Sequence, residues 1–165
     1  MAQITLKGNP VHTSGDLPAV GGAAPDFTLT KMDLSEVSKA DFKGRRVILN
    51  IFPSVDTPTC AASERAFSAR AAEKPNTAIL CVSADLPFAQ KRFCAAEGIA
   101  AVEPVSTFRN AGFLDAYGVK ILDGGLRGLC ARAVVVMDEN GTVLHTEMVS
   151  EIANEPNYDA ALAKL

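Results

Sequence analysis

Two short, almost uninterrupted apolar runs constrain the fold of this chain more than any other feature of its sequence. They are VILNIF at residues 47–52 and TAILCVS at residues 77–83, and each precedes a stretch with helical signals. Runs of this kind are typical of strands that are buried on both faces of a sheet. The alternation of strand and helix therefore predicts parallel β-α-β units with right-handed crossovers.

Each apolar run is followed by a helix with a recognisable start. Thr57 and Pro58 form an N-cap and a first helical residue, and the Ala-rich stretch 61–73 continues that helix. After the second run, Asp85 is in position to cap a helix that ends at Gly98. We therefore expect one helix after each of the two central strands.

The flanking segments predict antiparallel additions. Residues 1–32 hold many turns between short alternating pieces, which indicates an antiparallel N-terminal extension. An Asn-Gly turn between residues 133–138 and 142–149 predicts a β-hairpin, and a helix follows near residues 158–165. The chain is thus expected to form an α/β, thioredoxin-like fold, with a central mixed sheet flanked by helices and an N-terminal β-hairpin extension.

Composition narrows the class of protein further. A chain of 165 residues fits a single domain, residues 1–165. Hydrophobic residues make up 48% and the formal net charge is −3, which excludes intrinsic disorder and argues against nucleic-acid binding. The longest apolar stretches, 78–82 and 133–137, are far shorter than the roughly 20 residues of a membrane span. The N-terminus lacks the pattern of a signal peptide, so we expect a cytoplasmic protein.

Four cysteines stand at positions 60, 81, 94 and 130, and no two of them form a C-x-x-C motif. In a chain without a secretion signal, reduced thiols are expected rather than a framework of structural disulfides. The two histidines lie far from any cysteine pair in the sequence, so a zinc site has little support.

Cys60 is the cysteine whose surroundings indicate chemistry. It is the third residue of the helix capped by Thr57, and a first helical turn favours a thiolate over a thiol. Its N–H is one of the unpaired donors that the Thr57 hydroxyl can serve. The preceding strand ends at Pro53, which places Cys60 at the edge of the sheet where open α/β folds bind ligands. These observations predict a reactive thiol rather than a packing cysteine.

The segment P-S-V-D-T-P-T-C, residues 53–60, resembles the peroxiredoxin pattern of Pro, three residues, Thr or Ser, two residues, and Cys. From about residue 6 to residue 165 the chain is similar to bacterial thiol peroxidases, the atypical two-cysteine branch of the peroxiredoxins. The segments that carry this likeness are KGNPV, NIFPSVDTPTCAAS, CVSADLPFAQKRFC, STFRNAGFLDAYGV and ARAVVVMDENG.

The resemblance implies an antioxidant peroxidase that reduces hydrogen peroxide and organic hydroperoxides, forms a homodimer and takes electrons from thioredoxin. It calls for no cofactor and no metal. By motif match it implies that Cys60 is the peroxidatic cysteine and Cys94 the resolving cysteine, joined in a redox disulfide. It also carries over Pro53, Thr57 and Arg132 as residues of the pocket.

The chemistry of peroxide reduction fits these assignments. Thiolate attack on an O–O bond needs donors for the oxygens that gain negative charge, and the candidates are the Thr57 hydroxyl, the Cys60 N–H and the Arg132 guanidinium. Attack leaves a sulfenic acid, which a second thiol converts to a disulfide that thioredoxin reduces by exchange. Pro53 offers no donor and would form a wall of the pocket.

Geometry makes a separate prediction for Cys94. It lies roughly eight residues into its helix and therefore about 12 Å below the edge that holds Cys60. A disulfide requires Cα atoms within about 7 Å of each other. We therefore expect both helices to loosen locally when the bond between Cys60 and Cys94 forms.

The other two cysteines and three alternative interpretations remain to be considered. Cys81 is expected in the core, and Cys130 is expected to pack or to be exposed, with a minor role as an alternative thiol partner left open.

A thiol-disulfide oxidoreductase would need a cysteine at position 57, where Thr57 stands. A redox sensor would use Cys60 and Cys94 without steady turnover by thioredoxin. In a purely structural domain, substitution of Cys60 by Ser would not change peroxide consumption.

Overall fold

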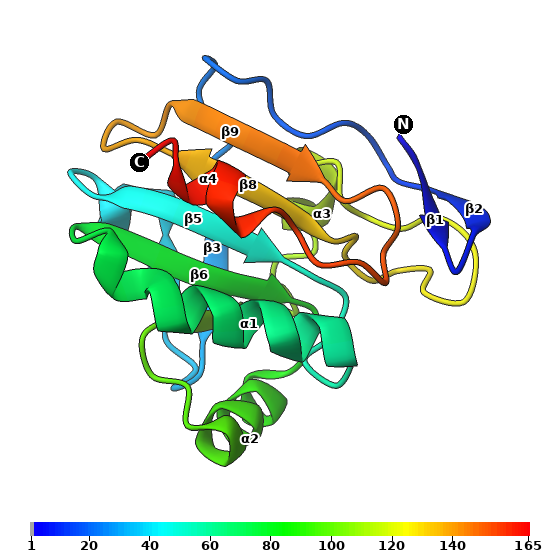
Figure 1. Ribbon diagram of the computed structural model, residues 1–165, viewed down its shortest axis with the longest axis horizontal. Coiled ribbons are helices and arrows are strands. Elements are labelled where there is room, and N and C mark those ends of the chain that lie inside the picture. Colours follow the sequence, from blue (N-terminus) through cyan, green and yellow to red (C-terminus); the bar gives the residue numbers. More distant parts are fainter. Residues whose placement is uncertain (1) are drawn as a thin grey trace.

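The computed structural model describes residues 2–165, which form a seven-stranded mixed sheet, a two-stranded sheet and helices on both faces of the larger sheet (Figure 1). The strands are β1 (Gln3–Leu6), β2 (Asn9–His12), β3 (Thr28–Lys31), β4 (Glu36–Ser38), β5 (Arg46–Ile51), β6 (Thr77–Ser83), β7 (Glu103–Ser106), β8 (Ala133–Met137) and β9 (Val143–Met148). The α-helices are α1 (Pro58–Arg70), α2 (Pro87–Glu97), α3 (Gly112–Ala116) and α4 (Tyr158–Leu162), and the 3-10 helices are η1 (Lys39–Phe42) and η2 (Ala71–Glu73).

The large sheet has a parallel centre with antiparallel edges. Its strand order is β4-β3-β7-β6-β5-β8-β9, and the pairs β5–β6 and β6–β7 are parallel. The two apolar runs of the sequence are β5 and β6, which pair in register from Arg46 with Thr77 to Ile51 with Val82. The hairpin predicted around the Asn-Gly turn is β8–β9. In the small N-terminal sheet, β1 pairs with β2. The expected thioredoxin-like α/β architecture is confirmed.

One part of the N-terminal extension does not stay separate from the main sheet. Residues 28–31 form β3, which pairs antiparallel with β7 through Thr30 and Ser106. The antiparallel pairing expected for residues 1–32 is therefore found in both sheets, with β1 and β2 in the small sheet and β3 in the large one. Leu29 is fully buried, and a two-stranded hairpin alone could not have provided that burial.

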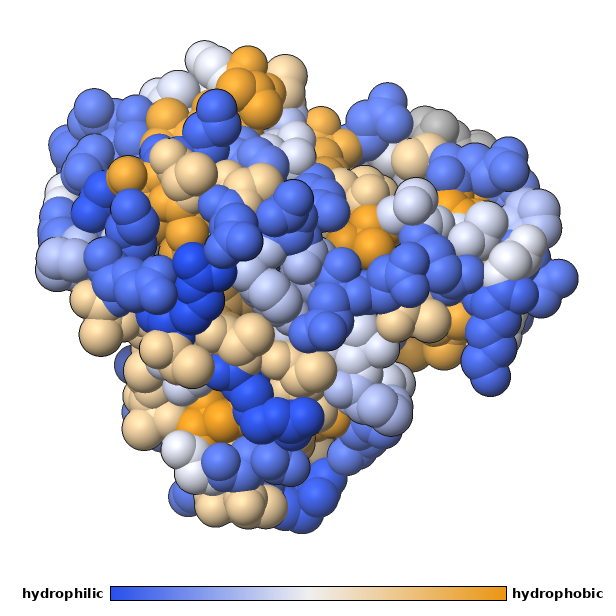
Figure 2. All heavy atoms as spheres, viewed as in Figure 1, coloured by the Kyte–Doolittle hydropathy of each residue, from blue (hydrophilic) through white to orange (hydrophobic). Residues whose placement is uncertain are grey.

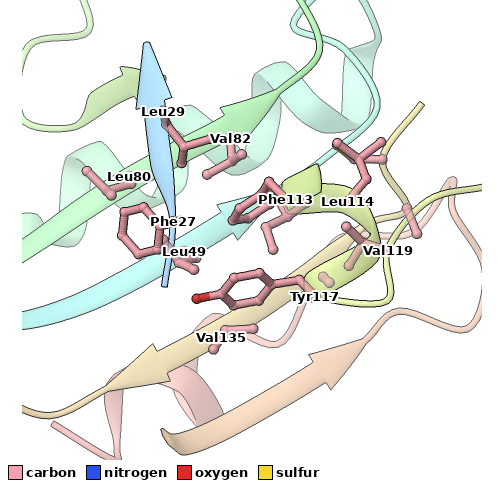
Figure 3. Close-up of a cluster of buried hydrophobic side chains, with 14 of the residues drawn as sticks. Phe27, Leu29, Leu49, Leu80, Val82, Phe113, Leu114, Tyr117, Val119 and Val135 are labelled. Carbon is pink, nitrogen blue, oxygen red and sulfur yellow. The ribbon is translucent and has the colours of Figure 1, made fainter. Parts of the chain in front are cut away.

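Alternation along the strands divides the interior into two hydrophobic clusters. Ile48 packs in the cluster under α1, α2 and α4, while its neighbour Leu49 packs in the cluster on the opposite face with α3. Figure 1 shows α1 and α4 in front of the sheet and α3 behind it. In Figure 3, Phe113 of α3 and Tyr117, which caps the end of that helix, point toward Leu49 and other sheet residues.

The molecular surface on the side of α1 and α2 is mixed in character. Figure 2 shows hydrophobic residues scattered in small patches among hydrophilic ones on this face. Among residues 2–165, none of the helices combines the length and the apolar character that a membrane span requires.

Candidate active site

Cys60 lies in the first turn of α1 and is fully buried. The helix begins with Pro58, as expected, and its first helical hydrogen bond runs from the Ala61 N–H to the Thr57 carbonyl over 3.1 Å. The N–H of Cys60 therefore precedes the first hydrogen bond of the helix. It is one of the donors at the N-terminal end that have no partner within the helix. The local structure provides the thiol with a positive helix terminus and a backbone donor.

The Thr57 hydroxyl does not cap α1, although Thr57 occupies the N-cap position. Its Oγ1 donates to the Ser54 carbonyl at 3.0 Å, and the Thr57 N–H donates to the same carbonyl at 3.2 Å. The hydroxyl accepts no hydrogen bond from the start of the helix, so the expectation that it serves the Cys60 N–H is wrong. The turn over residues 54–57 holds it against the Ser54 carbonyl instead. Its proton is engaged with Ser54, so the hydroxyl offers a lone pair to the pocket and not a donor.

Asp85 ties the loop before α1 to the end of β6. Its carboxylate accepts hydrogen bonds from the Ser54 hydroxyl at 2.7 Å, the Val55 N–H at 2.8 Å and the Ser83 hydroxyl at 2.7 Å. The expectation that Asp85 caps α2 is wrong, since that helix begins at Pro87 with Leu86 as its N-cap. The carboxylate is used by the neighbouring loop instead and fixes the segment that leads to Cys60.

Arg132 and Pro53 lie at the same end of the sheet. Ile51 of β5 pairs with Ala133 of β8, so Arg132 stands beside the chain as it leaves β5 toward the buried Pro53. The Arg132 side chain is only 2% exposed, and its Nε donates to the Ile152 carbonyl at 2.7 Å. Its Nη1 is buried without a hydrogen-bond partner among residues 2–165, which leaves a positively charged donor unused.

A short segment after β9 links Arg132 to α1. The Thr59 hydroxyl, next to Cys60, donates to the Ala153 carbonyl at 2.8 Å, one residue beyond the carbonyl that holds Arg132. The N-terminal sheet supports this segment, because the Thr5 N–H donates to the Ser150 carbonyl at 2.7 Å. Sequence reasoning missed this support, since no local pattern indicates a contact between residues so far apart in the chain.

Glu151 anchors the same segment to the N-terminal sheet. Its carboxylate accepts from the Gly8 N–H at 2.8 Å and the Ala153 N–H at 3.0 Å. These backbone donors lower the pKa of Glu151 to about 2. A charged Glu151 therefore helps to hold the segment that carries the Arg132 contact.

Cys94 is buried on α2 and faces α1 one turn below Cys60. Its Sγ donates to Oε1 of Glu64 at 3.7 Å, and Glu64 is four residues after Cys60 on α1. Burial, followed by the nearby Glu64 carboxyl, raises the pKa of Cys94 to about 12. Neither Cys60 nor Cys94 is in a disulfide in this structure.

The remaining cysteines are enclosed in the core. Cys81 lies in β6, fully buried as expected, and burial raises its pKa well above the ordinary value. Cys130 precedes β8 and packs in the cluster on the α3 face, where burial raises its pKa to about 12. Both environments favour the unreactive thiol form. Within the described part of the chain, no group of three or more His, Cys, Asp or Glu side chains is arranged to hold a metal ion.

Comparisons with known proteins identify the family. The model of the Redoxin family matches residues 19–162. A thiol peroxidase of Mycobacterium bovis is 60% identical over 165 residues, which cover 100% of this chain and 99% of the relative. The chain belongs to the redoxin family and, within it, to the thiol peroxidases.

Solved structures have the same architecture. A peroxiredoxin-like protein from Aquifex aeolicus matches with a TM-score of 0.93 and 38% identity, over 99% of this chain and 95% of that one. A thiol peroxidase from Chromobacterium violaceum matches with a TM-score of 0.91 over the same shares, and at 20% identity it bears on the fold alone.

Proposed function

We propose that this thiol peroxidase reduces hydrogen peroxide and organic hydroperoxides at Cys60, in antioxidant defence. The observation that carries the proposal is the position of Cys60 in the first turn of α1, at the end of the sheet that also holds the unused Arg132 donor. The nucleophile that breaks an O–O bond is a thiolate, and reactive cysteines typically lie at a helix N-terminus or beside a cation.

The surrounding groups divide the work of binding the peroxide. The Cys60 N–H and Nη1 of Arg132 donate to the oxygens that gain negative charge as the bond breaks. The Thr57 oxygen accepts the hydrogen of the peroxide O–H, since its own proton is bonded to Ser54. Pro53 is buried beside them and supplies an apolar wall without a competing N–H.

Attack on the peroxide converts Cys60 to a sulfenic acid, and the Cys94 thiol then displaces its hydroxyl to form a disulfide. Cys94 contacts the second turn of α1 in this structure, about 6 Å along the helix axis from the level of Cys60. We infer that the first turn of α1 and the part of α2 around Cys94 loosen to bring the two sulfur atoms together.

Some of the contacts that must yield between these helices are weak. Two ion pairs with partly exposed side chains join α1 and the loop before it to α2, and such pairs contribute at most about 1 kcal/mol each. They are Arg65 with Glu97 at 3.2 Å and Arg92 with Asp56 at 3.0 Å.

The proposal extends to partners and setting. Thioredoxin reduces the disulfide by thiol exchange, and the protein works in the cytoplasm as a homodimer whose subunit is one domain of residues 1–165. The family supports these points. Light scattering of the purified protein at micromolar concentration tests the homodimer, which a monomer mass would contradict.

Steady-state turnover tests the activity. Peroxide consumption is measured with thioredoxin, thioredoxin reductase and NADPH for the wild type, for Cys60→Ser and for Cys130→Ala as a matched control at another buried cysteine. We expect the first variant to lose activity and the second to retain most of it. Oxidation of Cys60 without steady turnover would identify a redox sensor instead, and unchanged activity in Cys60→Ser would reject the proposal.

A further inference from the structure

Glu64 is a carboxyl group that the proposed peroxide pocket does not use. It lies on α1 and is fully buried between that helix and α2. Its Oε1 accepts a hydrogen bond from the Cys94 thiol at 3.7 Å, while its Oε2 finds no hydrogen-bond partner in the described chain. A buried carboxyl with an unpaired oxygen is costly to the folded state, so its presence calls for a functional explanation.

The groups that face Glu64 carry no positive charge to balance it. They are Cys94 from α2, Cys81 from β6 and Asp85 from the loop after β6. On its own helix, the adjacent Arg65 is exposed and pairs with Glu97 at 3.2 Å. Burial therefore dominates and raises the pKa of Glu64 to about 7. The hydrogen bond from Cys94 opposes this rise, and the negative charge of Asp85 adds to it.

The position of Glu64 relates it to both cysteines of the cycle. Residues four apart lie on the same face of a helix, so Glu64 lies directly below Cys60 on α1. From the other side it contacts Cys94. The carboxyl is therefore the group next to the path that the Cys94 sulfur takes toward Cys60.

We propose that Glu64 is the proton acceptor for Cys94 in the step that forms the disulfide. This inference rests on the proposed function, because it concerns the resolving step of that cycle. The Glu64 carboxylate takes the thiol proton as the Cys94 sulfur attacks the sulfenic sulfur of Cys60. The new S–S bond forms while the S–O bond breaks, and the hydroxide that leaves takes the proton from Glu64 and departs as water.

The chemistry of the two groups fits this role. With a pKa of about 12, Cys94 is a thiol at neutral pH and does not attack without losing its proton. A general base is most effective when its pKa lies near the working pH, and Glu64 at about 7 meets that condition. An ordinary exposed carboxylate would be a weaker base.

The test separates the two steps of the cycle. Because the chain has no tryptophan, the reduced protein is mixed with one equivalent of hydrogen peroxide, quenched by thiol alkylation at set times, and analysed by mass spectrometry. The variants are Glu64→Gln, which keeps the shape of the side chain, and Glu73→Gln, which makes the same change on an exposed side chain in η2.

At pH 8 we expect Glu64→Gln to form the disulfide between Cys60 and Cys94 about 100-fold more slowly than the wild type, as for loss of a general base. Oxidation of Cys60 stays within about twofold in both variants, which also checks that the pocket is folded. Glu73→Gln resolves at the wild-type rate. Equal resolving rates in Glu64→Gln and the wild type would overturn the role of Glu64.

The pH profile of the wild type tests the same role without a variant. The rate of disulfide formation is expected to rise as Glu64 ionises and to level off above about pH 7. A rate that keeps rising tenfold per pH unit to pH 9 would show that hydroxide, and not Glu64, removes the proton. If Cys60 of the wild type does not oxidise at all, the proposed function itself fails, an outcome distinct from failure of this inference.

Discussion

The two faces of the central sheet differ in how completely their buried groups are satisfied. On the α3 face, aromatic and aliphatic side chains fill the space, and the Tyr117 hydroxyl donates to the Pro25 carbonyl at 2.7 Å (Figure 3). The interior on the α1 and α2 side includes Asn50, Glu64 and Gln90, each with one oxygen that lacks a partner among residues 2–165. One face is packed for stability, while the other keeps polar groups at a cost.

This difference separates the source of stability from the site of chemistry. Apolar burial contributes in proportion to the area removed from water, and the α3 face provides much of it. Buried polar groups without partners destabilise the folded state, and those of Asn50, Glu64 and Gln90 lie on the side of α1 and α2. Substitutions on the two faces are therefore expected to affect different measurements.

The largest effect on stability is expected for Phe113→Ala on the α3 face. The Phe113 ring stacks on Tyr117 at 4.5 Å and meets Phe27 edge-on at 6.3 Å. Removing it leaves a cavity and should lower the free energy of unfolding by about 3–5 kcal/mol, measured by urea denaturation. The rate of Cys60 oxidation under native conditions should hardly change. A large loss of that rate in the folded variant would contradict the division between the faces.

A somewhat smaller effect is expected from the titration of Glu64. Its pKa is about 7 in the folded protein against an ordinary value of 4.5, so the unfolded chain loses this proton first as the pH rises. The contribution of Glu64 to the free energy of unfolding is greatest below about pH 4.5. It is lost as the pH rises through 7, by about 3 kcal/mol in total. The free energy of unfolding of the wild type, measured relative to Glu64→Gln, should fall by this amount between pH 4 and pH 8. A pH-independent difference would show that Glu64 is not held in a desolvated site.

The smallest effect is expected at the link between α1 and the segment after β9. Thr59→Val keeps the side-chain shape but removes the hydrogen bond to the Ala153 carbonyl. We expect a loss of about 1 kcal/mol in the free energy of unfolding and a modest fall in the rate of Cys60 oxidation. Ser68→Ala, on the same helix, serves as a control. Equal oxidation rates in Thr59→Val and the wild type would show that this link does not position the pocket.

The sequence predicted the architecture well where local patterns determine it. The runs at β5 and β6 consist of residues that a buried strand requires, and Thr57-Pro58 marks the start of α1 in both sequence and structure. The sequence did not predict which sheet β3 joins, because four residues with a short alternating pattern do not specify a partner. Strand pairing over such distances depends on the whole core.

The candidate site was predicted less completely than the fold. Motif and helix position predicted Cys60 as the reactive thiol. A hydrogen bond within the turn at residues 54–57 changed the expected part of Thr57, and a long-range bond from Ser54 changed that of Asp85. Glu64 carries no motif, and a glutamate on a helix is normally exposed, so only packing against Cys94 reveals it.

A disulfide map tests the account most directly. The reduced wild type, Cys60→Ser and Cys94→Ser are each treated with one equivalent of hydrogen peroxide and analysed by mass spectrometry. We predict a bond between Cys60 and Cys94 in the wild type alone, with sulfenic acid trapped on Cys60 when Cys94 is replaced. An unreacted Cys60, or a bond from Cys60 to Cys130, would contradict the central claim.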